Sequence, residues 1–467
     1  MFRKVRRIHF VGIGGSGMSG IAEVLVNLGY RVTGSDLAQG DATRRLKKLG
    51  AKVMKGHRAD HVTSADVVVV SSAIRPDNPE VVEARRRKIP VIPRAEMLAE
   101  LMRLKYGIAV AGAHGKTSTT AMIAEVLTEG ELDPTVVIGG RVKSLRSGAK
   151  VGKGEFMVAE ADESDGSFLK MKPTIAVVTN IDREHLDHYA GLGEIQDAFV
   201  KFLSRVPFYG AAIVCLDEPN LRAILPRVDR KLVTYGLSSD ADLTADHVTF
   251  DGFGATFTAR QRRDKLGSVR LKVPGRHSVA NALAAIAVGL ELDVPFSKIA
   301  KALRRFRAVD RRFQLKGEAF GARVVDDYGH HPTEIEATLA AARDGFGART
   351  VVVFQPHRYT RTRALLEEFG RAFALADRVV VTEIYAAGEP AIEGVDGRSV
   401  AEAIARSGHR DVTFAERLAE VPKIVRAAIQ PGDLVLTLGA GDVWKVGDAL
   451  LAEAAEATPL RRRKEAR

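Results

Sequence analysis

GIAVAGAHGKTST, which runs from Gly107 to Thr119, joins a short apolar stretch to a glycine-rich turn and then to a predicted helix that continues to about Glu129. Its Gly115-Lys116-Thr117 step is the core of a phosphate-binding loop. In such loops backbone amides surround phosphate, the lysine neutralises the transferring group, and the hydroxyl can hold magnesium. The order of strand, loop, lysine and helix predicts nucleoside triphosphate binding and a strand–loop–helix unit of an α/β fold.

The spacing of this loop departs from the usual pattern. A glycine is expected five residues before Gly115, but Val110 stands there and Gly112 gives a shorter loop. The residues that we expect to surround the nucleotide phosphates are Gly112, Ala113, His114, Gly115, Lys116, Thr117 and Ser118.

Short apolar runs alternate with amphipathic stretches over nearly the whole chain, which indicates an α/β protein built on parallel sheets. Between Leu232 and Val273 the pattern becomes alternating, as in VTFDGFGATFTAR, and predicts an antiparallel patch beside the parallel core. The strands that we predict are Ile8–Ile13, Arg31–Gly34, Val67–Val70, Ile108–Ala111, Phe156–Glu160, Ile175–Thr179, Ala211–Val214, Val324–Asp326, Val351–Phe354, Arg378–Thr382 and Leu434–Leu438.

The length of 467 residues predicts about three domains. A predicted helix from Ala95 to Tyr106 precedes the phosphate loop, so we place the first junction near Lys105. A second junction is expected near Val309, where a helix gives way to charged residues and a new strand. The expected domains are therefore residues 1–105, 106–308 and 309–467.

Composition and charge exclude several classes of protein. Hydrophobic residues make up 46% and charged residues 27% of the chain, as in ordinary globular proteins, and no apolar run reaches the ~18 residues of a spanning helix. Of the net charge of +12, Met1–Arg7 and Arg461–Arg467 each carry +4, and we expect the basic C-terminal end to fray in solvent. These features favour a cytoplasmic enzyme without nucleic-acid binding, and Cys215 is expected to be a buried strand thiol.

A second glycine loop lies near the N-terminus. Gly12, Gly14 and Gly17 follow the strand IHFV as G-x-G-x-x-G, and Asp36 follows the next strand about twenty residues later. This is the fingerprint of a dinucleotide site, although a tight turn without a ligand has the same pattern. A redox enzyme would also need a site for a hydride-accepting partner, whereas the rest of this chain offers phosphoryl-transfer chemistry.

Acidic and histidine-rich segments follow two further strands. EADESDGSF (Glu160–Phe168) supplies four carboxylates, of which Glu160 lies at the strand end, and TNIDREHLDHY (Thr179–Tyr189) supplies His185 and His188. Carboxylates and one histidine suit Mg²⁺, whereas zinc needs more nitrogen or sulfur ligands. The alternatives are a solvated acidic loop and structural histidines.

These segments, taken in order with GIGGSGMSG, DDYGHHPTE and FQPHRYTRTR, resemble the Mur ligase family over nearly the whole chain. Members of that family use ATP to join an amino acid to a carboxylate. The resemblance implies three domains: an N-terminal Rossmann-like domain for a UDP-sugar, a central P-loop ATPase-type domain with a mixed sheet, and a C-terminal Rossmann-like domain for the amino acid. It is strongest to members that add L-alanine to UDP-N-acetylmuramate through an acyl phosphate in peptidoglycan precursor synthesis.

The resemblance also implies roles for individual residues. It assigns the UDP-sugar to Gly14, Gly15, Ser16, Gly17, Met18 and Asp36. It assigns magnesium to Thr117, Glu160 and His185, adenine to Asn281, the γ-phosphate to Arg312, and the ribose of ATP to Asp327. It assigns L-alanine to Tyr328, His357, Arg358 and Arg361, and catalysis to Lys116, Arg312 and His330. Ser278 replaces an asparagine that the family usually carries and is left out of the site, and Lys201 does not match the spacing of the carbamylated lysine of some members.

Three other functions stay open from the sequence alone. A family relative that attaches a preformed peptide to UDP-N-acetylmuramate would share the first two domains. A nicotinamide oxidoreductase would leave Lys116, Glu160 and His185 without a role, and a non-catalytic nucleotide-binding scaffold would release no phosphate. We expect a monomer or a homodimer with small-molecule substrates.

Overall fold

The structure is a computed structural model that describes residues 4–71, 73–142, 147–185 and 188–465. It divides into two compact units. One unit comprises Met1–His247, Phe257–Val269 and Ala280–Val309, and the other comprises Val248–Thr256, Arg270–Val279 and Asp310–Arg467. A unit boundary therefore falls between Val309 and Asp310. None of the helices among the described residues combines the length and apolar character that crossing a bilayer requires.

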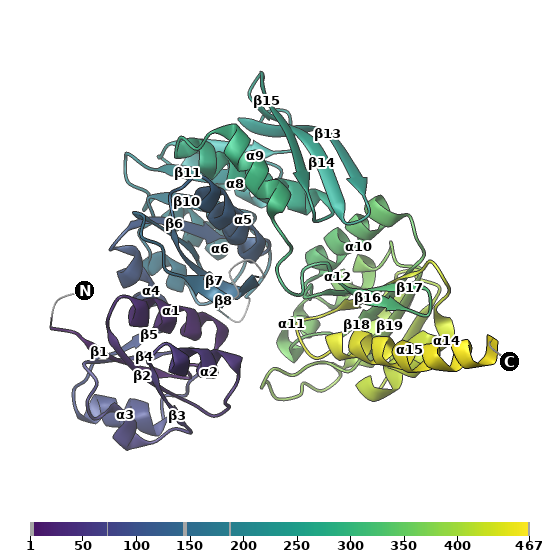
Figure 1. Cartoon of the computed structure of the whole chain (residues 1–467), viewed down its shortest axis with the longest axis horizontal. Helices are drawn as coiled ribbons and strands as arrows, with labels where there is room; N and C mark the ends of the chain where they lie inside the picture. The colour runs from purple at the N-terminus through teal and green to yellow at the C-terminus, as the bar shows by residue number, and fades with distance from the viewer. Residues whose placement is uncertain (1–3, 72, 143–146, 186–187, 466–467) are drawn as a thin grey trace. The chain divides into compact units, whose positions relative to one another are not determined.

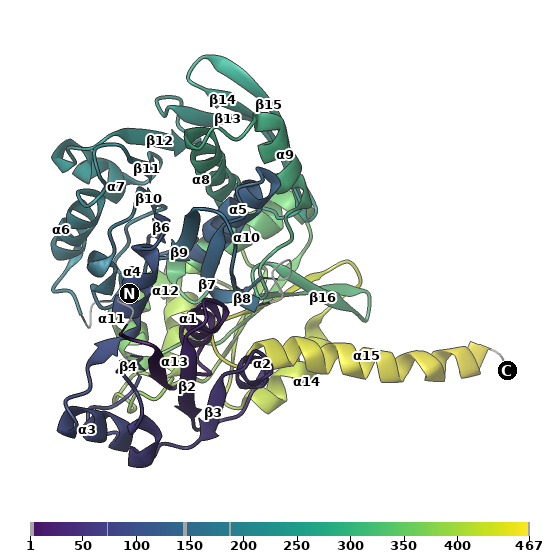
Figure 2. The same cartoon turned by 60° about the vertical axis from the view of Figure 1, so that its left-hand side comes forward.

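The N-terminal sheet has five parallel strands. In spatial order they are β3 (Lys52–Lys55), β2 (Arg31–Asp36), β1 (Arg7–Val11), β4 (Val67–Val70) and β5 (Val91–Pro93). Its helices are α1 (Ser16–Asn27), α2 (Asp41–Lys48), the 3₁₀ turn η1 (Ala59–Val62), α3 (Pro79–Arg86) and α4 (Arg94–Met102). Helices α1 and α2 lie on one side of the sheet and α3 on the other (Figure 2). Valine and isoleucine dominate the buried strands, as a sheet covered on both faces requires.

The central sheet has ten strands. In spatial order they are β15 (Asp264–Leu271), β14 (Gly254–Gln261), β13 (Leu243–Asp251), β12 (Leu232–Gly236), β11 (Ala211–Cys215), β10 (Ile175–Val178), β6 (Tyr106–Ala111), β9 (Phe156–Glu160), β7 (Thr135–Val142) and β8 (Ser147–Lys150). Its helices are α5 (Lys116–Glu129), η2 (Ser167–Lys170), α6 (Leu192–Leu203), α7 (Pro219–Ile224), η3 (Leu225–Arg227), α8 (Arg276–Glu291) and α9 (Phe296–Arg305). The six neighbouring strands β12, β11, β10, β6, β9 and β7 are parallel to one another. Strand β8 is antiparallel to β7, so the sheet is mixed.

The C-terminal sheet has six strands. In spatial order they are β16 (Gln314–Ala319), β17 (Ala322–Asp327), β21 (Leu434–Leu438), β18 (Thr350–Phe354), β19 (Arg378–Thr382) and β20 (Val412–Ala415). Its helices are α10 (Pro332–Phe346), α11 (Tyr359–Ala364), α12 (Leu366–Ala372), α13 (Gly397–Arg406), η4 (Leu418–Glu420), α14 (Val421–Ala428) and α15 (Trp444–Glu465) (Figure 1).

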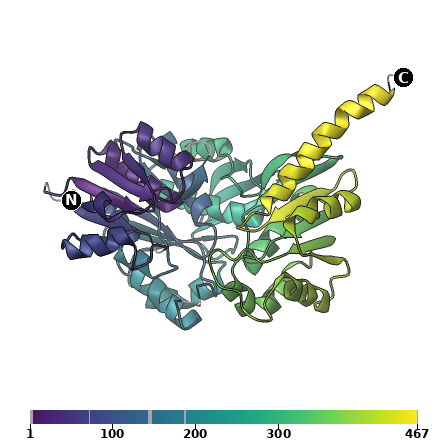
Figure 3. The ribbon, with the colours of Figure 1, turned by 90° about the horizontal axis from the view of Figure 1, so that it is seen from below.

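Successive residues of β18 show how this sheet is covered on both faces. Val352 and Phe354 belong to the core formed with α10, α12 and α13, whereas Val351 and Val353 belong to the core formed with α14 and α15. Side chains alternate between the faces of a strand, so a continuous apolar run supplies both cores. The far end of α15 projects away from the sheet (Figure 3), and the basic C-terminal end that we expected to fray is helical as far as Glu465.

Every strand that the sequence predicted is present, and the structure adds β3, β5, β7, β8, β16 and β20. The predicted helix Ala95–Tyr106 is too long, because α4 ends at Met102. Lys105 follows it, and its ammonium group donates to the carbonyls of Gly152 at 3.0 Å and Gly154 at 2.5 Å. The chain after α4 is thus fixed to the turn before β9, and Tyr106 already belongs to β6, which pairs with β9.

The antiparallel patch predicted from Leu232 to Val273 is wrong for its first strand, because β12 is parallel to both β11 and β13. Strands β13, β14 and β15 are neighbours in the sheet, and two-residue turns join them. A parallel pair needs a crossover of a dozen or more residues, so β14 runs antiparallel to both β13 and β15.

Candidate active site

The glycine loop after β1 is held by the end of β2. The amides of Gly12 and Ile13 donate to the carbonyl of Ser35 at 2.8 and 3.0 Å, and the amide of Gly14 donates to Oδ2 of Asp36 at 2.8 Å. A Cβ on Gly14 would lie 2.9 Å from the same oxygen, so a side chain there would have to displace the Asp36 carboxylate. The Asp36 carboxylate, which was assigned to the UDP-sugar, therefore also fixes the loop.

The other loop residues predicted to contact a nucleotide lie at the start of α1. The amide of Gly15 donates to the carbonyl of Gly12 at 3.2 Å, and Ser16 is the first helical residue. A Cβ on Gly17 would meet the Arg94 guanidinium at 2.9 Å, and Met18 is buried. The amides of this turn lie at a helix N-terminus, where the helix dipole favours an anion.

The phosphate loop after β6 places Lys116 at the first position of α5. Its two glycines have left-handed backbones, with φ of 133° at Gly112 and 81° at Gly115. The Lys116 ammonium donates to the carbonyls of Gly112 at 2.5 Å and Ala113 at 3.2 Å, and to Oε1 of Glu163 at 2.6 Å. Burial favours a lower pKa for Lys116, but the nearby carboxylates, led by Glu163 and Glu184, outweigh it and raise the pKa.

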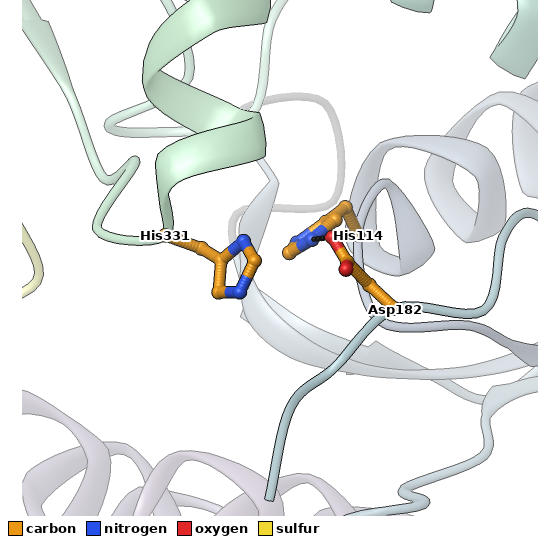
Figure 4. Close-up of side chains that lie close together, drawn as sticks. All are labelled: His114, Asp182 and His331. Atoms are coloured by element: carbon orange, nitrogen blue, oxygen red, sulfur yellow. Dashed lines mark hydrogen bonds and ion pairs between the residues drawn. The ribbon is translucent and has the colours of Figure 1, made fainter. Parts of the chain in front are cut away.

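His114, inside this loop, is held by the segment after β10. Its carbonyl accepts from Thr179 Oγ1 at 2.6 Å and Asn180 Nδ2 at 3.0 Å, and its amide donates to Asn180 Oδ1 at 2.8 Å. Its imidazole Nε2 lies 3.0 Å from Oδ2 of Asp182 (Figure 4). The sequence analysis missed Thr179, Asn180 and Asp182, although the motif TNID directly follows a strand next to β6 and so indicated their position.

A group suited to a cation lies beside Lys116. Glu163, Glu184 and His185 each offer one ligand atom, and these atoms lie within 4.8 Å of one another. Within the described part of the chain, Oε2 of Glu163 is buried without a hydrogen-bond partner. A buried carboxylate oxygen in this position fits a hard cation such as Mg²⁺.

Of the three predicted metal ligands, His185 belongs to this group, whereas Glu160 and Thr117 do not. His185 belongs to the group and has a left-handed backbone with φ of 56°. Burial favours a lower pKa for His185, but Glu163 and Glu184 raise it. Glu160, which the sequence selected, is not in the group; it ends β9 in register with Val110 of β6. Thr117 lies in the first turn of α5.

Asn281, predicted to contact adenine, packs against the phosphate loop. Its Oδ1 accepts a hydrogen bond from Thr119 Oγ1 at 3.0 Å, and a Cβ on Gly115 would lie 2.8 Å from the same atom. It therefore supports the turn of the loop, and its contact with adenine stays a prediction.

In the other compact unit, Asp327 and Arg312 organise the segment that begins at Asp310. The carboxylate of Asp327 accepts the amides of Phe313 and Gly329, both at 2.7 Å, and burial raises its pKa. The Arg312 guanidinium lies 3.3 Å from Oε1 of Glu334 and 5.3 Å from the centre of the Tyr328 ring.

Arg311, which the sequence analysis did not select, fixes the same segment to the sheet. Its guanidinium donates to Asp326 Oδ2 at 2.9 Å and to the carbonyl of Gly439 at 2.6 Å, and it lies 5.2 Å from the Tyr328 ring. The two arginines of the DRRF motif therefore differ: Arg311 binds Asp326 and the carbonyl of Gly439, whereas Arg312 pairs with Glu334.

Two histidines and Arg361 lie together at the ends of β17 and β18. The rings of His330 and His357 are 5.5 Å apart, and Arg361 Nη1 lies 3.3 Å from both Nδ1 and the carbonyl of His357. His357 also stacks on Tyr385, with ring centres 5.6 Å apart. Burial, His330, Arg361 and Arg358 lower the pKa of His357 to about 3, so the imidazole is neutral.

Arg358 begins α11 in an unusual backbone conformation, with φ of 70° and ψ of 137°. Its guanidinium lies 4.0 Å from Glu389, and its amide donates to the carbonyl of Tyr385 at 2.9 Å. The sequence analysis missed Glu389 and Tyr385, because the loop that carries them has no recognisable motif.

The structure places two further residues of the sequence analysis outside these clusters. Lys201 is exposed in the last turn of α6. Cys215 is buried at the end of β11, and burial raises the pKa of its thiol to about 12, as expected for an inert strand cysteine.

Family models match the chain in three consecutive blocks. They are described as the Mur ligase family catalytic domain over residues 7–106, the Mur ligase middle domain over residues 110–289, and the Mur ligase glutamate ligase domain over residues 311–441. The chain belongs to the Mur ligase family. The three blocks of this Mur ligase coincide with its three sheets.

Curated relatives match this Mur ligase over almost its full length. It is 58% identical to the UDP-N-acetylmuramate–L-alanine ligase of Geobacter sulfurreducens, with 98% of this chain and 99% of the relative covered. It is 57% identical to the enzyme of the same name from Myxococcus xanthus, with 98% and 97% covered.

Solved structures agree with this assignment. The crystal structure of the UDP-N-acetylmuramate-alanine ligase from Thermotoga maritima matches with a TM-score of 0.81 and 31% identity, covering 97% of this Mur ligase and 99% of that chain. A murein peptide ligase from Psychrobacter arcticus matches with a TM-score of 0.70 and 24% identity, covering 96% and 98%, which shows a shared fold.

Proposed function

We propose that this Mur ligase uses ATP to join L-alanine to the carboxylate of UDP-N-acetylmuramate, a step in peptidoglycan precursor synthesis. The identity of 56–58% to several curated relatives that carry this activity in their names is the observation that carries the proposal. The phosphate loop, with Lys116 at the first turn of α5, is consistent with an ATP-dependent enzyme.

The chemistry requires activation of a carboxylate, because oxide is too poor a leaving group for direct attack by an amine. The γ-phosphoryl group of ATP passes to a carboxylate oxygen, which gives an acyl phosphate and ADP. The alanine amine then attacks the acyl carbon. The bond between that carbon and the bridging oxygen breaks, phosphate leaves with the electron pair, and the nitrogen loses a proton. Lys116 and Arg312 would stabilise the negative charge that develops in both steps, and His330 would lie at the reaction centre.

Magnesium is the cofactor that we propose beside ATP. Glu163, Glu184 and His185 would hold it, with Thr117 and Glu160 as the further ligands expected from the sequence. Bound there, the ion would neutralise charge on the nucleotide phosphates. Glu163 would then have two functions in this chain, because one of its oxygens orients Lys116 while the other, which is buried without a hydrogen-bond partner among the described residues, would bind the ion.

The two other substrates are assigned to the outer domains. The glycine loop from Gly14 to Met18, fixed by Asp36, would bind the UDP part of the sugar nucleotide. In the C-terminal domain, Arg358 and Arg361 would bind the carboxylate of alanine, because a guanidinium can donate two parallel hydrogen bonds to it. Tyr328 and neutral His357 would line the same site. Since ATP is the phosphoryl donor, we infer that the enzyme acts in the cytoplasm.

The test is release of phosphate from ATP, measured with UDP-N-acetylmuramate and, in turn, L-alanine, glycine, L-serine and a tripeptide. We expect release that depends on both substrates and is fastest with L-alanine. Release that depends on the tripeptide instead would assign the enzyme to peptide recycling. Gel filtration with light scattering would decide between a monomer and a homodimer.

A further inference from the structure

A fully buried carboxylate, which has no role in the site described above, lies in the N-terminal domain. Glu80, in the first turn of α3, has an exposed fraction of 0%. His61 Nδ1 lies 2.6 Å from its Oε1, while Ser35 Oγ and His57 Nδ1 lie 2.5 and 3.3 Å from its Oε2. Nε2 of the equally buried His9 is 3.7 Å away. Three histidines and one serine therefore converge on a single carboxylate.

The charge of Glu80 follows from these partners. Burial by itself would raise the pKa of Glu80, but its interactions with His9, Ser35 and His61 lower the pKa to about 2. An ionised carboxylate accepts hydrogen bonds and donates none, so Ser35 Oγ and His61 Nδ1 each donate to it. His57 Nδ1 lies closer to Ser35 Oγ, at 2.9 Å, than to the carboxylate, at 3.3 Å. A buried ion with this many donors is costly to disturb, because removing the acceptor leaves the donors unsatisfied.

Ser35 connects this carboxylate to the glycine loop. Its hydroxyl donates to Glu80, and its carbonyl accepts the amides of Gly12 and Ile13. The next residue, Asp36, accepts the amide of Gly14. Three consecutive amides of the loop are thus held by two residues, one of which is anchored by Glu80.

The topology explains why an anchor is needed at this point. In the strand order β3-β2-β1-β4-β5, the chain changes direction between β1 and β4, which is where sheets of this kind bind ligands. Glu80 lies on α3, which follows β4, whereas Ser35 is on β2 and His57 follows β3. One side chain therefore connects the elements on the two sides of the switch point.

We propose that Glu80 is a positioning residue that fixes the sugar-nucleotide loop, through Ser35, in the conformation that binds UDP-N-acetylmuramate. The inference rests on the proposed function, because it assigns that substrate to the loop. Replacing Glu80 by glutamine keeps the shape but puts an NH₂ group where the carboxylate accepted two hydrogen bonds, so Ser35 or a histidine must turn away.

The test compares the parent enzyme with Glu80→Gln and Ser35→Ala in steady-state ligation and in calorimetric binding of UDP-N-acetylmuramate, well below the melting temperature. We expect Glu80→Gln to raise the KM and Kd for the sugar nucleotide at least tenfold, with kcat within threefold and the KM values for ATP and L-alanine within twofold. Ser35→Ala keeps the carbonyl that holds the loop, so we expect a smaller shift in the same direction.

Glu83→Gln is the matched control. Glu83 lies on the same helix and pairs with Arg86 at 2.7 Å and Arg87 at 2.5 Å, and these partners lower its pKa to about 2, but it contacts neither Ser35 nor the loop. The KM of Glu83→Gln for the sugar nucleotide should stay unchanged.

If Glu80→Gln melts at a lower temperature but keeps its sugar-nucleotide KM within twofold, Glu80 is only structural and the inference is wrong. If Glu80→Gln does not fold, an unchanged KM in Ser35→Ala overturns it. If the parent enzyme neither binds UDP-N-acetylmuramate nor uses it in ligation, the proposed function is wrong instead.

Discussion

Lys116 Nζ lies 2.6 Å from Oε1 of Glu163, so the lysine of the phosphate loop is oriented by a carboxylate from the segment after the neighbouring strand β9. The same ammonium group donates to two carbonyls of its own loop. Such preorganisation means that the charge is already in place when the transferring phosphate becomes more negative.

Lys116→Ala should abolish ATP-dependent ligation and leave binding of UDP-N-acetylmuramate nearly intact, because the lysine belongs to the central domain. Loss of one such group costs about 3 to 4 kcal/mol of barrier, or roughly 10² to 10³ in kcat. Phosphate release and calorimetric binding of the sugar nucleotide would measure the two effects. Ligation within tenfold of the parent rate would show that the assignment of the phosphate loop is wrong.

Glu163→Gln and Glu160→Gln distinguish the two carboxylates that the sequence and the structure favour for magnesium. Glu163→Gln should raise the Mg²⁺ concentration for half-maximal activity by tenfold or more, because it replaces a buried carboxylate that we propose as a metal ligand. Titration of ligation against MgCl₂ measures this directly. If only Glu160→Gln shifts the titration, the metal lies nearer the end of β9 than the structure indicates.

Arg358→Lys and Arg361→Lys should each raise the KM for L-alanine by roughly ten- to a hundredfold, with the KM for ATP little changed. Lysine keeps the charge but loses the paired donors, and a charge-assisted hydrogen bond contributes about 1.5 to 3 kcal/mol. Initial rates over a range of alanine concentrations give the KM. Variants that lose thermal stability but keep the alanine KM would show that these arginines only support Glu389 and His357.

His357 should make the protein less stable in mild acid. Its pKa of about 3 in the folded state is below the value of about 6.5 in an unfolded chain, so the unfolded chain binds the proton first as the pH falls. The contribution of neutral His357 to the free energy of unfolding is complete above pH 6.5 and is lost progressively as the pH falls toward 3. Between pH 7 and 5 the loss should be on the order of 1 to 2 kcal/mol. His357→Gln should lose less stability over this interval in urea titrations, and an identical loss would contradict the prediction.

The sequence predicted the features that are continuous along the chain. The phosphate loop, the first glycine loop and the parallel strands were recognised because each is encoded by a few adjacent residues. From the sequence we selected Glu160 rather than Glu163 because it lies at the strand end, but the position of these carboxylates depends on the path of the chain after β9. There Asp162 accepts the Ser164 amide at 3.1 Å and Gly166 adopts φ of 68°.

For the same reason, contacts between segments that are distant in the chain could not be predicted from the sequence. The partners of Glu80 range from His9 to His61 in sequence, and none of these residues belongs to a motif that predicts a buried cluster. Strand β16 was missed because its charged residues and Gly317 hide the alternation of an edge strand.

The backbone of Arg358 has a consequence for how this enzyme can be improved. A residue with φ of 70° and ψ of 137° is in a region that glycine occupies readily and that other residues enter at a cost of about 1 to 3 kcal/mol. Arg358→Gly should therefore melt at a higher temperature while binding alanine less well. Selection for thermal stability alone would favour loss of this arginine, so an engineering screen that scores only melting would discard a residue that the proposed reaction needs.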